Sequence, residues 1–599
     1  MNKKFLPITS EEAAARGWNS LDVIIVTGDA YVDHPSYGAA VLGRVLEAEG
    51  FRIGIIPQPD WRSLKDFKSL GRPRLFFGVT AGNLDSMLAN YTSNRNRRRE
   101  DEYSPGGKTG LRPDRATIIY TNRIKEAFPG TPVVIGGVEA SLRRLAHYDY
   151  WSDKVRKSIL LDSKADILVF GMGERQLIEI ARRLNGGEDI KRLDNIKGTV
   201  IARSSLGGIG GHILVPSFED VSQDKDKFNT AFMTIYEESD PKHGRTIVQP
   251  HGERFVIELP PAAPLTTPEM DSIYGLDYAR APHPRYGKEG GVPGFEAVRF
   301  SIISHRGCVG ACNFCSLYLH QGRIVQSRSP DSIVEEAGIL SNRPDFKGTI
   351  TDIGGPTANI FMADCKEWGA RGACRAKQCL MPAKCKNLKI DYDDTVRLWE
   401  RVRGLPRVKH LFIGSGLRFD LLLDNSAGKY LRELCRYHIS GRLKVAPEHT
   451  EDHVLKLMNK PSFRRYEEFA SKFDMVNREV GKKQFLVNYI ISGHPGCTLE
   501  DSLDLSLGLA KKHIHPEQIQ DFIPLPMTIS SSIYHTGKDP LTGKDVYVAK
   551  GLRERKLQRA LIQYDNPENR RYVIEALKKL GRMDLAKIFL AKRRKYEGW

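Results

Sequence analysis

The amino-acid sequence predicts an α/β protein built from two successive units, a doubly wound domain and then an incomplete barrel of six strand–helix units. Three observations predict this. Apolar strand-length runs alternate with amphipathic helix-length segments from residue 21 to about 210, the alternation fades from about 215 to 295, and it resumes from 298 to about 540. A chain of 599 residues is long enough for roughly three or four domains with large cores.

The first unit opens with a strand, a helix and a second strand. Residues 23–26 form a buried apolar run, residues 39–48 carry small and apolar residues at helical spacing before Gly50, and residues 52–56 form the next strand. The pattern recurs in "RLFFGVTAG", "TPVVIGGVEASLRRL" and "ADILVFGMGERQLIEIARRL". Residues 1–215 are therefore predicted to form a doubly wound α/β domain, with its ligand crevice at the carboxyl ends of the strands.

Periodicity is weak between residues 216 and 295, where prolines, charges and glycines dominate. We expect an ordered linker there, with one or two short strands between 245 and 258.

The second unit spans residues 296–540. Strands are expected near 298–304, 347–353, 408–413, 442–446, 484–492 and 517–523, with helices at about 330–341, 391–403, 425–438, 463–480 and 500–512. Six such units fit a partial (β/α)6 barrel, whose active face lies at the carboxyl ends of its strands. Residues 541–599 are polar and helix-forming, and are predicted to be a helical C-terminal appendage.

Composition limits the function classes. There is no run of 18 apolar residues and no apolar stretch near Met1, so we expect a cytoplasmic protein without a membrane partner. The net charge of +18 is compatible with a nucleic-acid partner. No motif combining basic and aromatic residues supports that partner.

Seven of the nine cysteines lie between residues 308 and 385, which is unlike the spread of a disulfide framework and indicates metal. Cys308, Cys312 and Cys315 directly follow the first barrel strand. Three thiolates suit a [4Fe–4S] cluster in which one iron is left open to a small molecule, whereas structural zinc sites use four protein ligands.

A second group falls in an insertion over residues 362–388. Its members are Cys365, Cys374, Cys379 and Cys385. Four thiols suit a complete Cys₄ site for an auxiliary iron–sulfur cluster or for zinc, and the neighbouring lysines and arginines would favour thiolates. The alternative is a loop with partly free or redox-active thiols.

The spacing Cys308-x3-Cys312-x2-Cys315, with Phe314 before the last cysteine, resembles the signature of the radical S-adenosylmethionine (SAM) superfamily. The resemblance implies that SAM chelates the open iron. One electron then cleaves SAM to methionine and a 5′-deoxyadenosyl radical, which abstracts hydrogen from a substrate that the sequence does not identify. It also implies an electron donor such as flavodoxin or ferredoxin.

Further segments extend the resemblance. Gly354 and Gly355 in "TDIGGPT" resemble the superfamily's Gly-Gly-Glu segment, whose backbone binds the SAM amino group, although Pro356 stands in the third position. "LKVAPEHTEDHVLKLMNKP" and "NYIISGHPGCTLEDSLDL" are similar to segments of methylthiotransferase-like radical SAM enzymes. The order of motifs along nearly the full chain, including "DAYVDHPSYG" and "GGVEASLRR", resembles the YgiQ-like family.

The first domain resembles the cobalamin-binding-like module often placed before such barrels. A cobalamin lower-ligand motif would read Asp-x-His-x-x-Gly, and this chain has Asp33-His34-x3-Gly38. Because that spacing differs, we expect no cobalamin and regard His34 as a loop or crevice residue.

Three functions follow from these observations: a radical SAM enzyme, an RNA-modifying enzyme of the methylthiotransferase type, and a non-catalytic iron–sulfur redox carrier or sensor. No catalytic acid or base is assigned. Glu448, His449 and His494 stand at expected strand ends, where they could serve acid–base chemistry or make structural hydrogen bonds.

Overall fold

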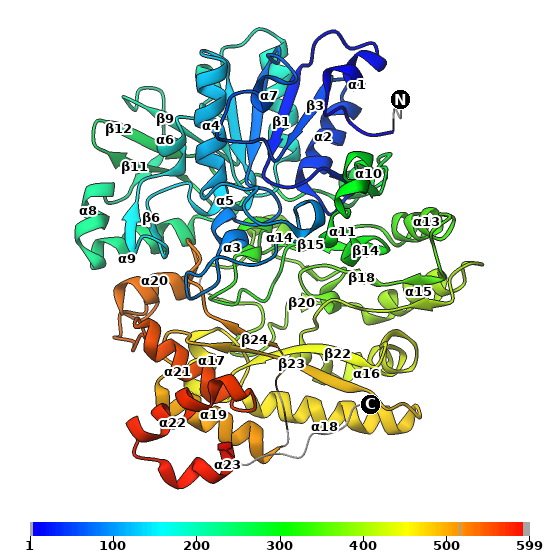
Figure 1. The fold of residues 1–599 in the computed structure, drawn as a ribbon, viewed down its shortest axis with the longest axis vertical. Helices are drawn as coiled ribbons and strands as arrows, with labels where there is room; N and C mark the ends of the chain where they lie inside the picture. Colours follow the sequence, from blue (N-terminus) through cyan, green and yellow to red (C-terminus); the bar gives the residue numbers. More distant parts are fainter. Residues whose placement is uncertain (1–3, 376, 513, 515, 517, 591–599) are drawn as a thin grey trace.

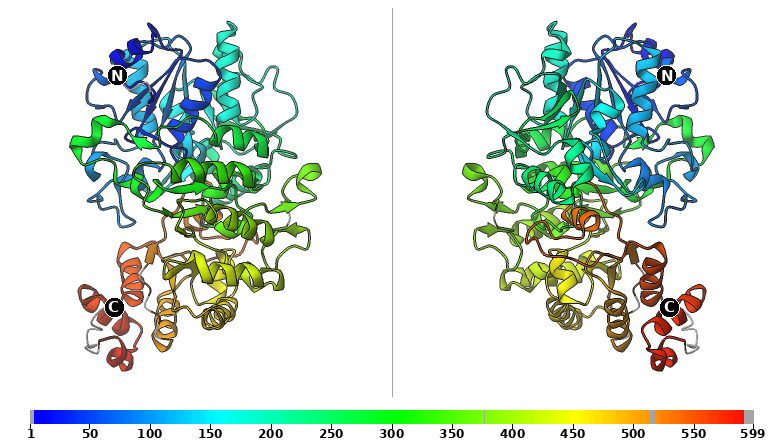
Figure 2. Two further views of the ribbon diagram at one scale, coloured as in Figure 1. Left: turned by 90° about the vertical axis from the view of Figure 1, so that its right-hand side faces the viewer. Right: turned by 90° about the vertical axis from the view of Figure 1, so that its left-hand side faces the viewer.

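The computed structural model describes residues 4–375, 377–512, 514, 516 and 518–590. Figure 1 shows the N-terminal sheet at one end of the molecule, the barrel strands in the middle and the C-terminal helices at the other end. The side views in Figure 2 show the C-terminal helices standing out as a separate lobe below the barrel. No helix among the described residues is long and apolar enough to cross a membrane.

A nine-stranded sheet forms the core of the N-terminal domain. Five neighbouring strands are parallel and follow the spatial order second, first, third, fourth, fifth, which is a doubly wound order. In sheet order they are β3 (Ile53–Pro57), β1 (Val23–Thr27), β4 (Phe76–Thr80), β5 (Val133–Gly136) and β8 (Ile167–Val169).

Both faces of this sheet are buried, as the continuous apolar strand sequences require. Along β1, Val23 and Ile25 belong to one hydrophobic core, whereas Ile24 and Val26 belong to the other. The first core includes residues of α2 (Gly38–Ala48) and α7 (Glu174–Asn185), and the second includes residues of α4 (Ala116–Ala127). Helices on both faces thus explain why β1 has no polar side.

The domain does not end near residue 215, so the expected boundary and linker were wrong, although the short strands expected between 245 and 258 are present. The sheet continues through four more strands: β9 (Thr199–Arg203), β12 (Arg254–Glu258), β11 (Thr246–His251) and β10 (His212–Leu214). The helices α8 (Phe218–Gln223) and α9 (Lys225–Glu237) lie between β10 and β11 in the chain. Their N-terminal caps, Ser217 and Asp224, were the sequence signal for these helices.

The segment after β12 is folded as well. It contains α10 (Thr267–Tyr274) and α11 (Pro293–Val298), so the first barrel strand, β14 (Ser301–Ile303), starts later than expected.

Six short parallel strands form the partial barrel. β14 pairs with β18 (Asp352–Gly354), and β17 (Thr349–Ile350), on the same stretch of chain as β18, pairs with β21 (His410–Leu411). A parallel bridge joins Leu417 to Val445 in β22. β22 (Arg442–Glu448), β23 (Phe485–Ser492) and β24 (Gln518–Asp521) complete the series. The predicted fold class is confirmed.

Helices follow the barrel strands at the expected places. They are α13 (Pro330–Ser341), α15 (Tyr392–Arg403), α16 (Gly428–Glu433), α18 (Phe463–Glu479) and α19 (Leu499–Lys511). The C-terminal appendage contains α21 (Leu552–Ile562), α22 (Arg570–Lys579) and α23 (Ala586–Leu590). One apolar cluster joins these helices to α19. The end of the expected appendage, residues 591–599, lies outside the described residues.

Candidate metal centre

The first cysteine loop is closed at its base by a small antiparallel pairing. β15 (His305–Arg306) pairs with β16 (Gln326–Ser327), and the Cys308 N–H donates to the Gly322 carbonyl at 3.1 Å. The three cysteines of the loop therefore lie just beyond the carboxyl end of the first barrel strand, where barrels place their chemistry.

Two of the three sulfurs of this loop, those of Cys308 and Cys312, lie close to Gly310. A Cβ atom at Gly310 would lie 3.3 Å from the Cys308 sulfur and 3.8 Å from the Cys312 sulfur. Burial, followed by the charge of Cys312, raises the pKa of Cys308 to about 11 and that of Cys315 to about 12. Thiols with a raised pKa hold their protons at neutral pH, and a bound metal would displace those protons.

A buried ionic network faces the cysteine loop. The Arg418 guanidinium lies 3.6 Å from the Cys312 sulfur and 2.8 Å from the Asp420 carboxylate. Beyond it, the Lys460 ammonium lies 3.6 Å from the Glu448 carboxylate, and burial raises the pKa of Glu448. Two cations thus stand next to a site that would carry thiolates, which lowers the cost of burying negative charge.

Sequence reasoning missed Arg418, Asp420 and Lys460. Arg418 and Asp420 had only their place after the third barrel strand as a signal, whereas Lys460 lies within the quoted segment "LKVAPEHTEDHVLKLMNKP".

The segment after β22 clamps the cysteine loop from one side. The Asn313 N–H donates to the Met458 carbonyl at 3.0 Å, and the Asn313 side chain donates to the Leu457 carbonyl at 2.9 Å. The Asn459 side chain donates to the Ala311 carbonyl at 2.9 Å. Ala311 and Asn459 both have positive φ, of 43° and 56°. Such a conformation is uncommon for alanine and is held here by the surrounding hydrogen bonds.

The two glycines expected to bind SAM lie beside this loop. Ser304, which leads into β15, donates its N–H to the Gly354 carbonyl at 2.8 Å. A Cβ atom at Gly355 would lie 2.7 Å from the His305 ring, and one at Gly354 would lie 2.3 Å from the Ser415 hydroxyl oxygen. Neither position has room for a side chain, so both backbones are held close to the first strand.

The histidines at the strand ends make local hydrogen bonds. His494 contacts the Pro495 carbonyl through Nδ1 at 2.8 Å and the Ser530 hydroxyl through Nε2 at 2.7 Å. The Nε2 atom of His449 lies 3.4 Å from the Cys497 sulfur. Burial lowers the pKa of His494 to about 3 and that of His449 to about 4. Both imidazoles are thus neutral structural groups at physiological pH.

The second cysteine group also comes together. Cys365, Cys374, Cys379 and Cys385 all line one small pocket. Burial raises the pKa of Cys379 to about 11, with Arg323 opposing the rise and the other three thiols adding to it.

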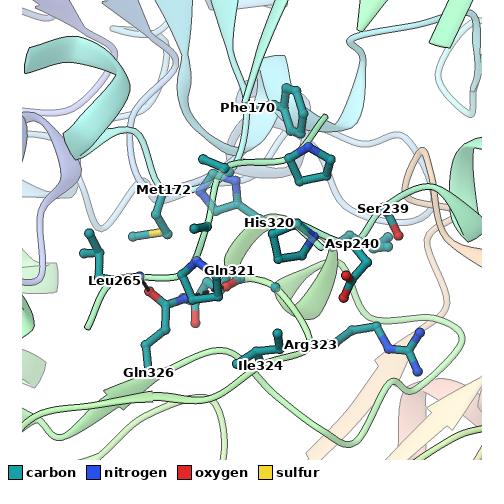
Figure 3. A pocket seen from close by; sticks show the side chains of 18 of the residues that line it. Phe170, Met172, Ser239, Asp240, Leu265, His320, Gln321, Arg323, Ile324 and Gln326 are labelled. Atoms are coloured by element: carbon teal, nitrogen blue, oxygen red, sulfur yellow. Dashed lines mark hydrogen bonds between the residues drawn. The ribbon is translucent and has the colours of Figure 1, made fainter. Parts of the chain in front are cut away.

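A larger pocket lies between the N-terminal domain and the cysteine loop (Figure 3). Phe170 and Met172, which follow β8, line it on one side, and His320 and Arg323, which follow Cys315 in the chain, line it on the other. Its cavity volume is about 100 Å³. Burial lowers the pKa of His320 to about 4, so a neutral imidazole faces this space.

The crevice at the topological switch point of the N-terminal sheet, between β1 and β4, is filled by the chain itself. A Cβ atom at Gly28 would lie 2.1 Å from the Ala81 carbonyl oxygen. Arg112 is buried there and bridges Asp29 at 2.9 Å and Asp101 at 3.2 Å. Doubly wound domains commonly bind their ligands at such a crevice, and here it is closed by ion pairs.

His34 lies in the loop before α2. It is fully buried, accepts a hydrogen bond at Nδ1 from the Ser36 N–H at 3.1 Å, and packs edge-on against Phe295 with ring centroids 6.0 Å apart.

Three family profiles match the chain in succession. Radical SAM N-terminal matches residues 5–301, Radical SAM superfamily matches residues 302–505, and a domain of unknown function, DUF3362, matches residues 517–589. Together with the barrel and the cysteine loop, these matches define the chain as a radical SAM enzyme. Membership of this superfamily implies a [4Fe–4S] cluster and SAM as cofactors.

Relatives identify the family more narrowly. A UPF0313 protein of Methanosarcina acetivorans is 50% identical over 97% of this chain and 81% of the relative. A UPF0313 protein of Clostridium botulinum (strain Kyoto / Type A2) is 49% identical over 98% of this chain and 90% of the relative. The chain belongs to the UPF0313 family, and the expected YgiQ-like membership is confirmed.

Solved structures with similar folds include two radical SAM proteins. One is the methyltransferase TsrM from Kitasatospora setae with cobalamin and a [4Fe–4S] cluster bound, with a TM-score of 0.47, 16% identity and coverage of 86% of this chain and 74% of that one. The other is the cobalamin-dependent enzyme OxsB with aqua-cobalamin and SAM bound, with a TM-score of 0.49, 10% identity and coverage of 95% and 72%.

Proposed function

We propose that this enzyme holds a [4Fe–4S] cluster on Cys308, Cys312 and Cys315 and reductively cleaves SAM bound beside Gly354 and Gly355. The observation that carries the proposal is that the sulfurs of Cys308 and Cys312 both lie within 4 Å of the Cβ position of Gly310, next to the buried Arg418.

The residues present fit these cofactors. Thiolates are the usual protein ligands of iron–sulfur clusters, and three of them leave one iron for a small-molecule ligand. Residue 310 is a glycine, so no side chain crowds the Cys308 and Cys312 sulfurs. When bound, the cluster supplies the electron that cleaves the sulfonium of SAM and releases a 5′-deoxyadenosyl radical.

The chain's own residues prepare this site. Arg418 places a positive charge next to Cys312, and Asp420 fixes the guanidinium through two hydrogen bonds of 2.9 and 2.8 Å. Asn313 of the loop donates to the segment after β22, and Asn459 of that segment donates to the loop, so the loop backbone is held in place. Gly354 and Gly355 present backbone groups without side chains at the end of the neighbouring strand.

The proposal is tested with anaerobically reconstituted protein. Dithionite and SAM are added, 5′-deoxyadenosine is quantified by chromatography, and iron and sulfide are counted in parallel. We expect product from the native chain and none from a variant with all three loop cysteines changed to alanine. The matched control is Cys435→Ala, because Cys435 is buried in the apolar core of the barrel, away from both cysteine groups. If the native protein carries a verified cluster and yields no product, a non-catalytic redox carrier is favoured instead.

A further inference from the structure

The second cysteine group has a structure of its own that the proposed function does not use. Its four thiols line one pocket together with Trp368 and Lys377. They come from separate places in the insertion and meet because the ends of the insertion pair: β19 (Asp364–Cys365) is antiparallel to β20 (Leu388–Lys389), with Cys365 opposite Leu388. The Cys385 N–H donates to the Cys379 carbonyl at 2.8 Å, which brings the third and fourth cysteines together.

The loop that carries these cysteines is held from outside by the N-terminal domain. The Ala373 N–H donates to the Asp240 carboxylate at 2.7 Å, and the Arg375 guanidinium donates to Glu238 at 3.1 Å and to His243 Nδ1 at 2.9 Å. Glu238, Asp240 and His243 follow the end of α9. A loop that binds a metal needs its ligands held in place by such hydrogen bonds, whereas a loop with incidental free thiols does not.

The spacing of the thiols favours a polynuclear centre. In a tetrahedral zinc site the sulfurs lie about 3.8 Å apart, given a Zn–S bond of about 2.3 Å. Among the described residues, the one group of three or more ligand atoms lying within 4.8 Å of each other is Glu451, His453 and Asp501, so neither cysteine group is packed that tightly. An iron–sulfur cube places its thiolates on separate irons and spreads them further apart.

The second group also connects with the first. One apolar cluster contains Cys308 of the first loop and Cys365, Cys379 and Cys385 of the second, with Val309, Ile324, Ile360 and Leu421 among its members. At the other side of the second group, Cys374 is exposed to solvent. The four thiols therefore run from the molecular surface to the apolar packing around the first site.

We propose that Cys365, Cys374, Cys379 and Cys385 hold a second [4Fe–4S] cluster that serves as the electron entry point of this enzyme. A low-potential one-electron carrier docks at the Cys374 side and gives one electron to the second cluster. That electron then passes to the first site, and the second cluster returns to its oxidised state. No covalent bond or proton changes place in this transfer. The electron-transfer role rests on the proposed function, whereas the metal site does not.

Metal content tests the site. After anaerobic reconstitution with ferrous iron and sulfide, we expect about eight irons per native chain and about four in the Cys374→Ser/Cys379→Ser variant. The variant lacking the three cysteines of the first loop should also retain about four, and Cys435→Ala should retain about eight. After dithionite reduction, adding SAM should change the electron paramagnetic resonance spectrum of the Cys374→Ser/Cys379→Ser variant, because that variant keeps the first cluster.

Two results would overturn the site. One is an unchanged iron count in the Cys374→Ser/Cys379→Ser variant, and the other is zinc bound at one equivalent that this variant loses. Cys374 is exposed, so the single variant Cys374→Ser cannot disturb the core. A reduced iron content in this single variant would exclude misfolding as the cause of the iron loss. If the first-loop variant binds as much iron as the native chain while the Cys374→Ser/Cys379→Ser variant loses iron, the proposed function fails and the second site stands.

Reduction kinetics test the role. We measure the rate at which a reduced ferredoxin or flavodoxin reduces the first cluster. This rate is divided by the rate of reduction by dithionite, because dithionite is small enough to reach either site. We expect this ratio to fall at least tenfold in the Cys374→Ser/Cys379→Ser variant. A ratio equal to that of the native protein would show that electrons enter elsewhere.

Discussion

The guanidinium of Arg418 links the sulfur of Cys312 to the carboxylate of Asp420: Nη1 lies 3.6 Å from the sulfur, and Nε and Nη2 lie 2.9 and 2.8 Å from the two carboxylate oxygens. A buried cation beside a thiolate favours the more negative, reduced form of a cluster. We expect Arg418→Met to lower the midpoint potential of the first cluster by about 60 mV or more, a tenfold change in the reduction equilibrium. The measurement is a redox titration followed by electron paramagnetic resonance.

Asp420→Asn is the companion variant. It removes the negative charge that offsets Arg418, so the midpoint potential should rise. If Arg418→Met and Asp420→Asn shift the potential in the same direction, the charge of Arg418 does not control it.

Gly355 has no space for a side chain next to His305. A Cβ atom there would lie 2.7 Å from the imidazole ring and 2.7 Å from the His305 carbonyl oxygen, so the segment must move. Overpacking of this kind costs about 1–3 kcal/mol, and we expect Gly355→Ala to weaken SAM binding about tenfold or more while the iron content stays normal.

The control is Gly338→Ala in α13, where a Cβ atom meets nothing within 4 Å. Both variants are compared by equilibrium binding of SAM to reconstituted protein. Native affinity in Gly355→Ala would show that this glycine does not shape the SAM site.

The lowered pKa of His494 predicts that the folded protein loses stability in acid. Burial lowers its pKa to about 3, from an ordinary value of about 6.5, so the folded state resists protonation. The contribution of His494 to the free energy of unfolding is therefore complete above pH 6.5. It is lost as the pH falls from 6.5 toward 3, at up to about 1.4 kcal/mol per pH unit.

We expect His494→Gln to have a shallower loss of stability between pH 8 and pH 5 than the native chain, measured by urea denaturation with circular dichroism. His453→Gln is the control because His453 is more than half exposed. Equal slopes in the native chain and His494→Gln would contradict the prediction.

The filled switch point predicts that the protein takes up no cobalamin. Arg112, Asp29 and Asp101 occupy the crevice between β1 and β4, and His34 is buried against Phe295. Protein incubated anaerobically with hydroxocobalamin and then desalted should show no corrin absorption. Retention of one equivalent after desalting would contradict this prediction and would require the crevice to open.

The sequence was sufficient for the fold class and for most strands and helices of the barrel, because buried parallel strands and amphipathic helices have strong periodic signals. It misplaced the end of the first domain. β12 joins the sheet by antiparallel pairing with β9, and β11 joins it through β12. Strands were expected there, but the long-range pairing of β12 with β9 leaves no local signal.

The candidate site was predicted only in part, because local sequence patterns are visible in a sequence and long-range contacts are not. Cysteine spacing marks Cys308, Cys312 and Cys315 because their loop is continuous in the chain. Arg418 and Lys460 come from segments far along the chain, so tertiary packing alone brings their charges next to the cysteines.

The contacts from Glu238, Asp240 and His243 to the cysteine insertion also impose an order on biosynthesis. The chain leaves the ribosome from its N-terminus, and domains generally fold as they emerge. The sheet of the first domain is complete at Glu258, more than a hundred residues before Cys365 is made. The acidic turn after α9 is therefore in place before the cysteines arrive. Cofactor maturation would then begin on a preformed template, and a nascent chain truncated before Cys385 would present that template with an incomplete set of thiols.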